Sequence, residues 1–329
     1  MATRVLQKVQ GALESTAGTF ATATRKLYAT DITHERTVAS IRPDYLDGTY
    51  NQSRAVYEGI ETNAFSLTGP FAFDQSVFWL NAGVGSATAV GASAPYVWTF
   101  NAASTADTTR SFSLEYGWGD GGTAVPASFR VPGNKVNTLN INWVKDDVVS
   151  FEVGVVSPKG MTQGTALSAT PSDTVERHAV GVNTTVYIDG TATSIGTTAD
   201  ANVVVAGLAI TNGFASKFGL DGSLTAASLA RTAKTEAVLT LTRHFQNDTE
   251  LDAWEDKSLR RVRIVTTGAT LGAGNYELTL DFYGVIDEIT QSDVDGSVAQ
   301  EITLRPYVDG TVTTVPFSLV VKNNQSTIS

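Results

Sequence analysis

Apolar and polar residues alternate with a period of two along much of the chain. The alternation is clearest at positions 111–116, 139–143, 149–155 and 276–282. Such segments bury one face of a strand and leave the other polar, which is typical of antiparallel sheets. Clusters of glycine, aspartate or asparagine at 119–122, 146–147, 212–213 and 309–310 predict turns. The pattern predicts an all-β fold.

Helices are expected at few places. Positions 74–81 and 248–257 begin with Asp74 and Asp248, residues suited to cap a helix N-terminus. A third helical pattern lies at 3–13. The rest of the first 60 residues is polar and irregular, and we expect it to be a disordered arm or a functional loop.

Two parts of the chain resemble each other. Residues 66–74 (SLTGPFAFD) align with 240–248 (TLTRHFQND) at an offset of 174, and a tryptophan follows in each predicted helix. Downstream, 113–117 resembles 280–284 and 149–151 resembles 315–317, at offsets of 167 and 166. The smaller offset predicts a short insertion in the first copy, at 83–95. The matches favour a duplication, with chance similarity between alternating strands as the alternative.

Composition limits the function classes. The 329 residues are enough for one large or two ordinary domains. Only 17% are charged, against about 25% in typical domains, so a neutral polar surface suited to protein–protein contact is expected. The net charge of −10 argues against gripping nucleic acid. An acidic surface is nevertheless suited to DNA that must slide without binding.

Other sequence signals are absent. The chain has no cysteine, which excludes disulfides and thiolate chemistry. It has no apolar run of about 18 residues, so no membrane association is expected. The N-terminal segment lacks the apolar core of a secretory signal, which predicts synthesis in a cytoplasm.

Candidate catalytic and metal-binding patterns are weak. His34, His178 and His244 have no metal-ligand spacing and are interpreted as surface or interface residues. Positions 293–296 resemble the start of a calcium loop, but Leu304 stands where the bidentate glutamate belongs, so a tight turn is predicted. Positions 117–122 lack the lysine of a phosphate loop and predict an exposed loop. No enzyme activity, cofactor, metal or small-molecule substrate is expected.

Two charged clusters have structural explanations. The acid pair at 146–147 is expected to face solvent on a hairpin turn. Arg260, Arg261 and Arg263 form the one local basic cluster. It is interpreted as a solvated strand face or an inter-subunit salt bridge, since three charges give little phosphate affinity.

Five segments of the first half of the chain belong together: 25–28 (RKLY), 65–70 (FSLTGP) leading into the predicted helix with Trp79, 96–100 (YVWTF), 113–117 (SLEYG) and the hairpin at 136–156. In these segments the chain resembles the tail tube (major tail) proteins of long-tailed, siphovirus-type bacteriophages. The resemblance covers about residues 22–160, and the second half joins through the internal repeat.

This resemblance implies two tandem tail-tube domains, each a β-sandwich or half-barrel with a short flanking α-helix. The boundaries are an N-terminal arm at 1–21, copy 1 at 22–156, a linker at 157–184 and copy 2 at 185–329. Copies of the chain would form rings with a β-barrel lumen, as trimers with pseudo-sixfold symmetry or, alternatively, hexamers. Stacked rings would form the tail tube, the conduit for DNA ejection, in a virion assembled with tape measure and tail terminator or tip proteins.

Six residues are candidates for contacts within and between rings: Arg25, Tyr28, Arg42, Tyr45, Tyr50 and Trp118. The alternative function is a non-catalytic β-sandwich binding module or adhesin. In that case Trp98, Tyr116 and Trp118 would line a sugar-binding platform.

Overall fold

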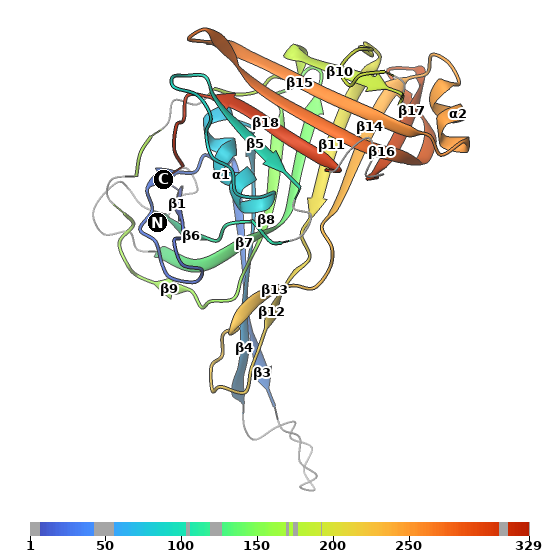
Figure 1. Ribbon diagram of the computed structural model, residues 1–329. Coiled ribbons are helices and arrows are strands. Elements are labelled where there is room, and N and C mark those ends of the chain that lie inside the picture. The colour runs from blue at the N-terminus through green and yellow to red at the C-terminus, as the bar shows by residue number, and fades with distance from the viewer. Residues whose placement is uncertain are drawn as a thin grey trace, which may run out of the picture.

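The computed structural model describes residues 7–42, 56–102, 106–118, 127–168, 171–173, 177–191, 193–308 and 315–328 (Figure 1). Strands make up 57% of the structure and helices 7%, which confirms the all-β prediction. The two helices in these residues are too short to span a membrane.

The first half of the chain forms nine strands and one helix: β1 (Gln7–Leu13), β2 (Arg25–Lys26), β3 (Asp31–Ile41), β4 (Tyr57–Pro70), α1 (Phe73–Gly83), β5 (Tyr96–Asn101), β6 (Phe112–Trp118), β7 (Ala127–Val144), β8 (Ser150–Ser157) and β9 (Thr162–Gln163). The second half forms a 3-10 turn (Gly181–Asn183), β10 (Thr184–Asp189), β11 (Val203–Thr211), β12 (Phe214–Lys217), β13 (Ser228–Arg231), β14 (Glu236–His244), α2 (Thr249–Glu255), β15 (Leu259–Leu271), β16 (Gly274–Val294), β17 (Ser297–Pro306) and β18 (Phe317–Asn323).

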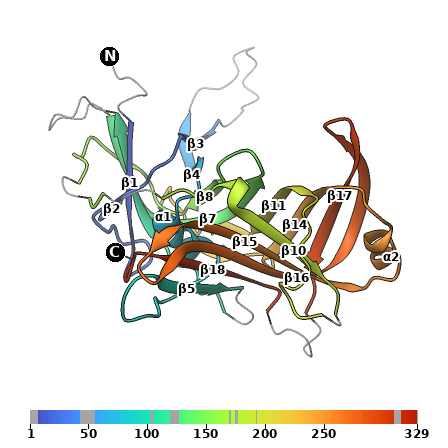
Figure 2. The same ribbon diagram turned by 90° about the horizontal axis from the view of Figure 1, so that it is seen from above.

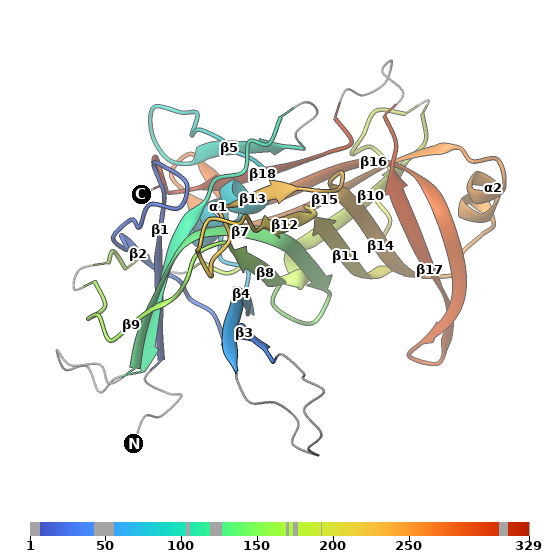
Figure 3. The ribbon, with the colours of Figure 1, turned by 90° about the horizontal axis from the view of Figure 1, so that it is seen from below.

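Eight strands from both halves form one continuous antiparallel layer, which we call the long sheet. Its order is β3-β4-β8-β7-β11-β14-β17-β16. Figure 3 shows strands of this layer side by side, from blue β4 through green β8 to orange β17. The long sheet therefore crosses from one half of the chain to the other at the β7–β11 pair.

Two strands are long enough to belong to both layers of the molecule. The N-terminal part of β7 pairs with β6, and its C-terminal part pairs with β8 and β11. In the same way, β16 pairs first with β15 and β18 and then with β17. The second layer consists of α1 with β2-β1-β6-β7-β9 at one end and β10-β15-β16-β18-β5 at the other (Figure 2).

A single hydrophobic core lies between the layers and includes residues from both halves. Trp143 of β7 is 3% exposed, and its indole N–H donates to Thr266 Oγ1 of β15 at 3.1 Å. Strands β5 and β18, from opposite halves of the chain, also pair with each other. The two halves therefore share both a core and a backbone hydrogen-bond network.

The second half repeats the strand pairings of the first. Six strand pairs of the first half each have a counterpart in the second: β3–β4 corresponds to β11–β14, β4–β8 to β14–β17, β7–β8 to β16–β17, β6–β7 to β15–β16, β1–β6 to β10–β15 and β7–β9 to β16–β18. A helix follows β4 and β14 alike. A register shift occurs at Val136/Thr138 in β7 and again at Ile286/Glu288 in β16.

This correspondence changes part of the sequence alignment. It equates β6 with β15 and β8 with β17, so the matches of 113–117 with 280–284 and of 149–151 with 315–317 join strands that are not equivalent. The insertion in the first half is also longer than expected. Residues 84–111, which contain β5, stand where only 256–258 connect α2 to β15.

Other local predictions differ in outcome. The helix predicted at 3–13 is wrong, because residues 7–13 form β1 in register with β6. Within the N-terminal arm assigned to 1–21, residues 7–13 therefore pair inside the chain. Both remaining helices are confirmed, but Ala72 takes the N-cap position of α1, whereas Asp74 lies in its first turn. There the Asp74 carboxylate accepts the Asn324 backbone N–H at 3.0 Å, and burial raises the pKa of Asp74.

Two of the predicted turns connect consecutive strands of the long sheet. Positions 146–147 connect β7 to β8, and Asp295 and Gly296 connect β16 to β17 with φ of 53° and 74°. The tight turn predicted at 293–296 is thus confirmed. Positions 212–213 lie between β11 and β12. The turns expected at 119–122 and 309–310 lie outside the described residues.

Candidate functional site

One face of the long sheet packs on the core, and the other remains accessible. Burial alternates along its strands, as in β8 and β14, where every second side chain is buried. The accessible side chains, which we call the open face, lie opposite one another in register from strand to strand. They are Asp31, Thr33, Glu35, Ala64, Ser66, Thr68, Ser150, Glu152, Gly154, Val156, Lys135, Thr138, Asn140, Asn142, Val144, Val205, Gly207, Ala209, Thr211, Glu236, Val238, Thr240, Thr242, Glu301, Thr303, Arg305, Val285, Glu288 and Thr290.

Most side chains of the open face are uncharged, and most of its charged side chains are acidic. Serine, threonine, asparagine and glycine dominate it, and it has six carboxylates against two cations, the guanidinium of Arg305 and the ammonium of Lys135. That guanidinium donates to Asp287 at 2.7 Å. A surface of this composition attracts few phosphate groups and repels polyanions.

The long sheet has an open edge at each end within the described residues. Strand β3 pairs with β4 alone, and residues 287–294 of β16 pair with β17 alone. Most side chains along both edges are exposed or half-buried. Unpaired edges of this length are templates for pairing with another chain.

Two hairpins project from the same side of the molecule (Figure 1). One is β3–β4, and the other is β12–β13, which extends the β11–β14 pair. They touch through the Glu61 N–H, which donates to the Leu224 carbonyl at 2.7 Å. Eight of the fifteen exposed large apolar side chains in the described residues lie on these hairpins: Val38, Ile41, Val56, Tyr57, Ile60, Phe218, Leu220 and Leu224. Such a concentration marks a contact surface.

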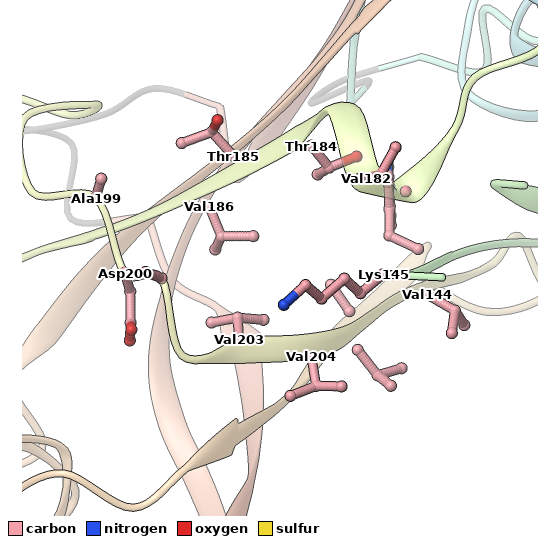
Figure 4. Close-up of a pocket in the computed structure, with 15 residues that line it drawn as sticks. Val144, Lys145, Val182, Thr184, Thr185, Val186, Ala199, Asp200, Val203 and Val204 are labelled. Carbon is pink, nitrogen blue, oxygen red and sulfur yellow. The ribbon is translucent and has the colours of Figure 1, made fainter. Parts of the chain in front are cut away.

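A hollow of about 280 Å³ lies beside the β7–β11 junction (Figure 4). Val144, Val186 and Val203 line it together with the end of β7, and the Lys145 side chain reaches across it. The Asp200 carboxylate lies at one end and forms an ion pair with Arg243 at 3.3 Å. The hollow is mostly apolar and contains no convergent set of polar groups, so its lining does not define a catalytic site.

A second hollow of about 670 Å³ lies beside the β3 edge. Its lining includes His34, Arg36, Tyr116 and Gln163. The His34 ring stacks on Phe65 with centroids 4.4 Å apart.

The hydrogen bonds of the His34 ring indicate its protonation state. Tyr116 Oη lies against Nδ1, and Nε2 lies 3.1 Å from Asn63 Oδ1. With a proton on Nε2, the ring donates to Asn63 and accepts from the Tyr116 hydroxyl. Burial lowers the pKa of His34, so this neutral form prevails at pH 7.

The structure separates the six predicted contact residues. Arg25 is 1% exposed inside its own chain, so its side chain is not available to a neighbour. Tyr28 is half-buried after β2, and Arg42 is exposed at the end of β3. Trp118 ends β6 opposite Gln7. Tyr45 and Tyr50 lie outside the described residues.

The sugar-binding platform of the alternative function is not supported. Trp98 and Tyr116 are each 2% exposed, and the Trp98 indole N–H donates to Asn323 Oδ1 at 3.1 Å. Both belong to the core. A platform requires exposed ring faces, which these two side chains lack.

The basic cluster on β15 has partners within the chain. Arg260 contacts Glu250 at 3.0 Å, and Arg263 donates twice to Asp281, at 2.6 and 2.7 Å. Arg261 donates to the Thr193 carbonyl at 2.9 Å. Across the described residues, no three His, Asp or Glu side chains gather as metal ligands would.

Sequence reasoning missed the open face and its edges as sites. Alternation in β8, β14 and β17 shows that two faces differ, but it does not show which strands are neighbours. The apolar residues at 38, 41, 56, 57 and 60 are the signal that could have identified the projecting hairpin, since they stand in a part of the sequence without regular alternation.

No protein-family model matches the chain, and no curated protein matches it.

Proposed function

We propose that the chain is a structural protein that assembles into stacked rings, forming the tail tube of a long-tailed bacteriophage through which DNA leaves the virion. The observation that carries the proposal is the long sheet: eight strands with a core on one side, an acidic polar face on the other and an open edge at each end. A sheet of this kind loses its open edges when copies join into a closed barrel.

The open face suits the wall of a DNA channel. It has six carboxylates and two cations, of which Arg305 is paired with Asp287 and Lys135 with Asp107. DNA would be repelled from such a wall and would slide along neutral hydroxyl and amide groups. The whole chain has the same bias, with 33 acidic and 23 basic residues.

The repeated pairings support two tandem tube domains per chain. Each half contributes four strands to the long sheet, β3-β4-β8-β7 and β11-β14-β17-β16. Three chains would then supply 24 strands with pseudo-sixfold symmetry. Strands spaced about 4.8 Å apart and tilted by about 40° give a barrel roughly 40–50 Å across between backbones, which is wide enough for a DNA double helix.

The projecting hairpins are the proposed contacts between rings. They project from one side of the molecule and carry exposed apolar side chains, which a neighbouring ring would cover. Head-to-tail stacking of closed rings then continues along one axis. A tape measure protein and terminator or tip proteins are the other partners we expect in the virion.

The proposal is tested by electron microscopy of the purified chain in negative stain. We expect rings with three chains, together with stacked tubes at high concentration. Particles that remain single chains at every concentration and in virion preparations would refute the proposal. Rings of six chains would contradict the arrangement in which each half of the chain fills one ring position, while leaving the tube intact.

The acidic wall gives a second test. Replacing Glu152 and Glu301 with lysine should leave assembly intact, because both side chains are exposed on the open face. The altered rings should bind a short DNA duplex with a Kd of about 10⁻⁶–10⁻⁴ M at physiological salt, weakening as salt rises. Wild-type rings should not bind it. Fluorescence anisotropy of the labelled duplex at two salt concentrations measures both.

The matched control carries lysine at Glu255 and Asp256, which are exposed at the end of α2, away from the open face. It makes the same change in net charge and should not retain DNA. Equal binding by both variants would show that the open face does not face the channel.

A further inference from the structure

The junction between the two halves of the chain is itself a strand pair, β7–β11. Its register places Asn140 opposite Ala209, Thr138 opposite Thr211 and Val144 opposite Val205. Both strands are edges of their own four-strand unit. The chain therefore contains one complete example of how the edge of one unit joins the edge of the next.

The repeat identifies the strands that correspond to this junction. The alignment of 66–74 with 240–248 equates Thr68 with Thr242. Thr68 lies opposite Asp31 of β3, and Thr242 lies opposite Val205 of β11, so Asp31 and Val205 are equivalent positions. Four residues further on, Glu35 corresponds to Ala209. The counterpart of β11 is thus β3, the open edge at the other end of the long sheet.

The pairing registers of the two halves also identify the counterpart of β7. Thr68 lies opposite Glu152, and Glu152 opposite Asn140. In the second half Thr242 lies opposite Glu301, and Glu301 opposite Thr290. Asn140 therefore corresponds to Thr290, and the register shifts at Val136/Thr138 and Ile286/Glu288 agree with this assignment.

We propose that β16 of one chain pairs with β3 of the next chain, antiparallel and in the register of the internal β7–β11 junction. Thr290 would lie opposite Glu35 of the neighbour, and Glu288 opposite Thr37. The partner is a second copy of this chain. The inference rests on the proposed function and specifies its interface residue by residue.

The two hollows agree with this arrangement. At the internal junction the apolar hollow lies beside the end of β7, where Trp143 enters the core. The residue of β16 that corresponds to Trp143 is Asp293. The hollow beside β3 is lined by residues of β3, among them His34 and Arg36, just as the hollow at the internal junction is lined by residues of β11. The two hollows thus lie at equivalent strands, β3 and β11.

The contact is heterologous, because β3 and β16 are different edges of the same sheet. A heterologous contact closes into a ring when the rotation between copies fits a whole number of them. The proposed junction repeats the internal one, so all joints around the ring would have the same geometry. Neither edge would then remain unpaired.

Disulfide formation tests the register, since the chain has no cysteine of its own. Directly opposite residues in an antiparallel pair have Cα atoms about 4.5–5.5 Å apart, within the range of a disulfide. The test variants are Glu35→Cys with Thr290→Cys and, as a second pair, Thr37→Cys with Glu288→Cys. All four positions are exposed, so the folded chain should tolerate them.

The internal positive control is Ala209→Cys with Asn140→Cys, the equivalent pair within one chain. The mismatch control is Glu35→Cys with Gln291→Cys, in which the second side chain points to the opposite face of the strand. Each variant is oxidised and run on a non-reducing gel, and its assembly is followed by electron microscopy.

We expect both test pairs to give covalent species of two and three chains and no larger, whereas the internal control oxidises without joining chains. The mismatch control should stay at least tenfold less cross-linked. Rings in which neither test pair oxidises, or in which the mismatch oxidises equally, would overturn the register but leave the tube function standing. Absence of rings in every variant and in the wild type would instead overturn the proposed function.

Discussion

A chain with lysine at both Glu35 and Thr290 is expected to fold normally and to lose most of its ability to form rings. The two positions are exposed on the open edges of the long sheet and lie opposite each other across the proposed contact. Like charges directly opposite on neighbouring strands repel each other.

The size of the effect follows from the number of contacts. A directly opposed pair of like charges costs about 1 kcal/mol, and a closed ring of three chains contains three such pairs. The free energy of ring formation should therefore weaken by about 3 kcal/mol, which lowers the association constant roughly a hundredfold. Sedimentation across a range of protein concentrations measures this shift.

The single substitution Thr290→Lys is the control. It places a cation opposite the native Glu35 and beside Glu301, its partner within the chain, so ring formation should be unchanged or stronger. Adding Glu35→Lys then replaces the attraction between positions 35 and 290 by repulsion. This second substitution lies in β3 and makes no further change in β16. If single and double variants assembled equally, Glu35 and Thr290 could not be opposite each other.

Truncation of Phe78 to alanine should have the largest effect on the stability of the single chain. Phe78 is fully buried on α1, with its ring centroid 5.1 Å from that of Trp79 and 5.5 Å from that of Phe112, both edge-on. The Arg25 guanidinium lies 5.9 Å from the ring centroid on another side. The ring thus connects α1 to β6 and β2. Its removal should lower the free energy of unfolding by about 3–5 kcal/mol.

Urea denaturation measures this loss as a lower midpoint at an unchanged slope. The control is Asp252→Ala, since Asp252 is the equivalent position on α2 and is exposed. It should change stability by no more than about 0.5 kcal/mol. Equal effects of the two substitutions would mean that the aromatic cluster under α1 does not carry the stability assigned to it.

The strands and the two main helices were predictable because their signals are local. In β8 every second residue from Phe151 to Val155 is apolar, and in β14 the same holds from Ala237 to Leu241. Burial on one face of a strand leaves this pattern whatever the neighbouring strands are. The helix predicted at 3–13 failed because a short mixed segment follows its partner strand, here β6, rather than its own propensity.

Strand neighbours could not be predicted. Residues 113–117 and 280–284 look alike because both alternate and end in Tyr-Gly, yet β6 corresponds to β15 in the pairing order. Arg25 shows the same limit for single residues. A basic residue is expected at the surface, but β2 packs against β1 and places its side chain inside the protein.

The sequence by itself determined that the chain is all-β, acidic, free of cysteine and internally similar at an offset of 174. These properties depend on composition and on neighbours along the chain. Only the tertiary structure decided that eight strands from both halves join in one sheet and that six carboxylates share one face. It also placed open edges at β3 and β16. Pairing and burial of this kind arise between residues far apart in sequence, where the local pattern specifies a face but not the strand beside it.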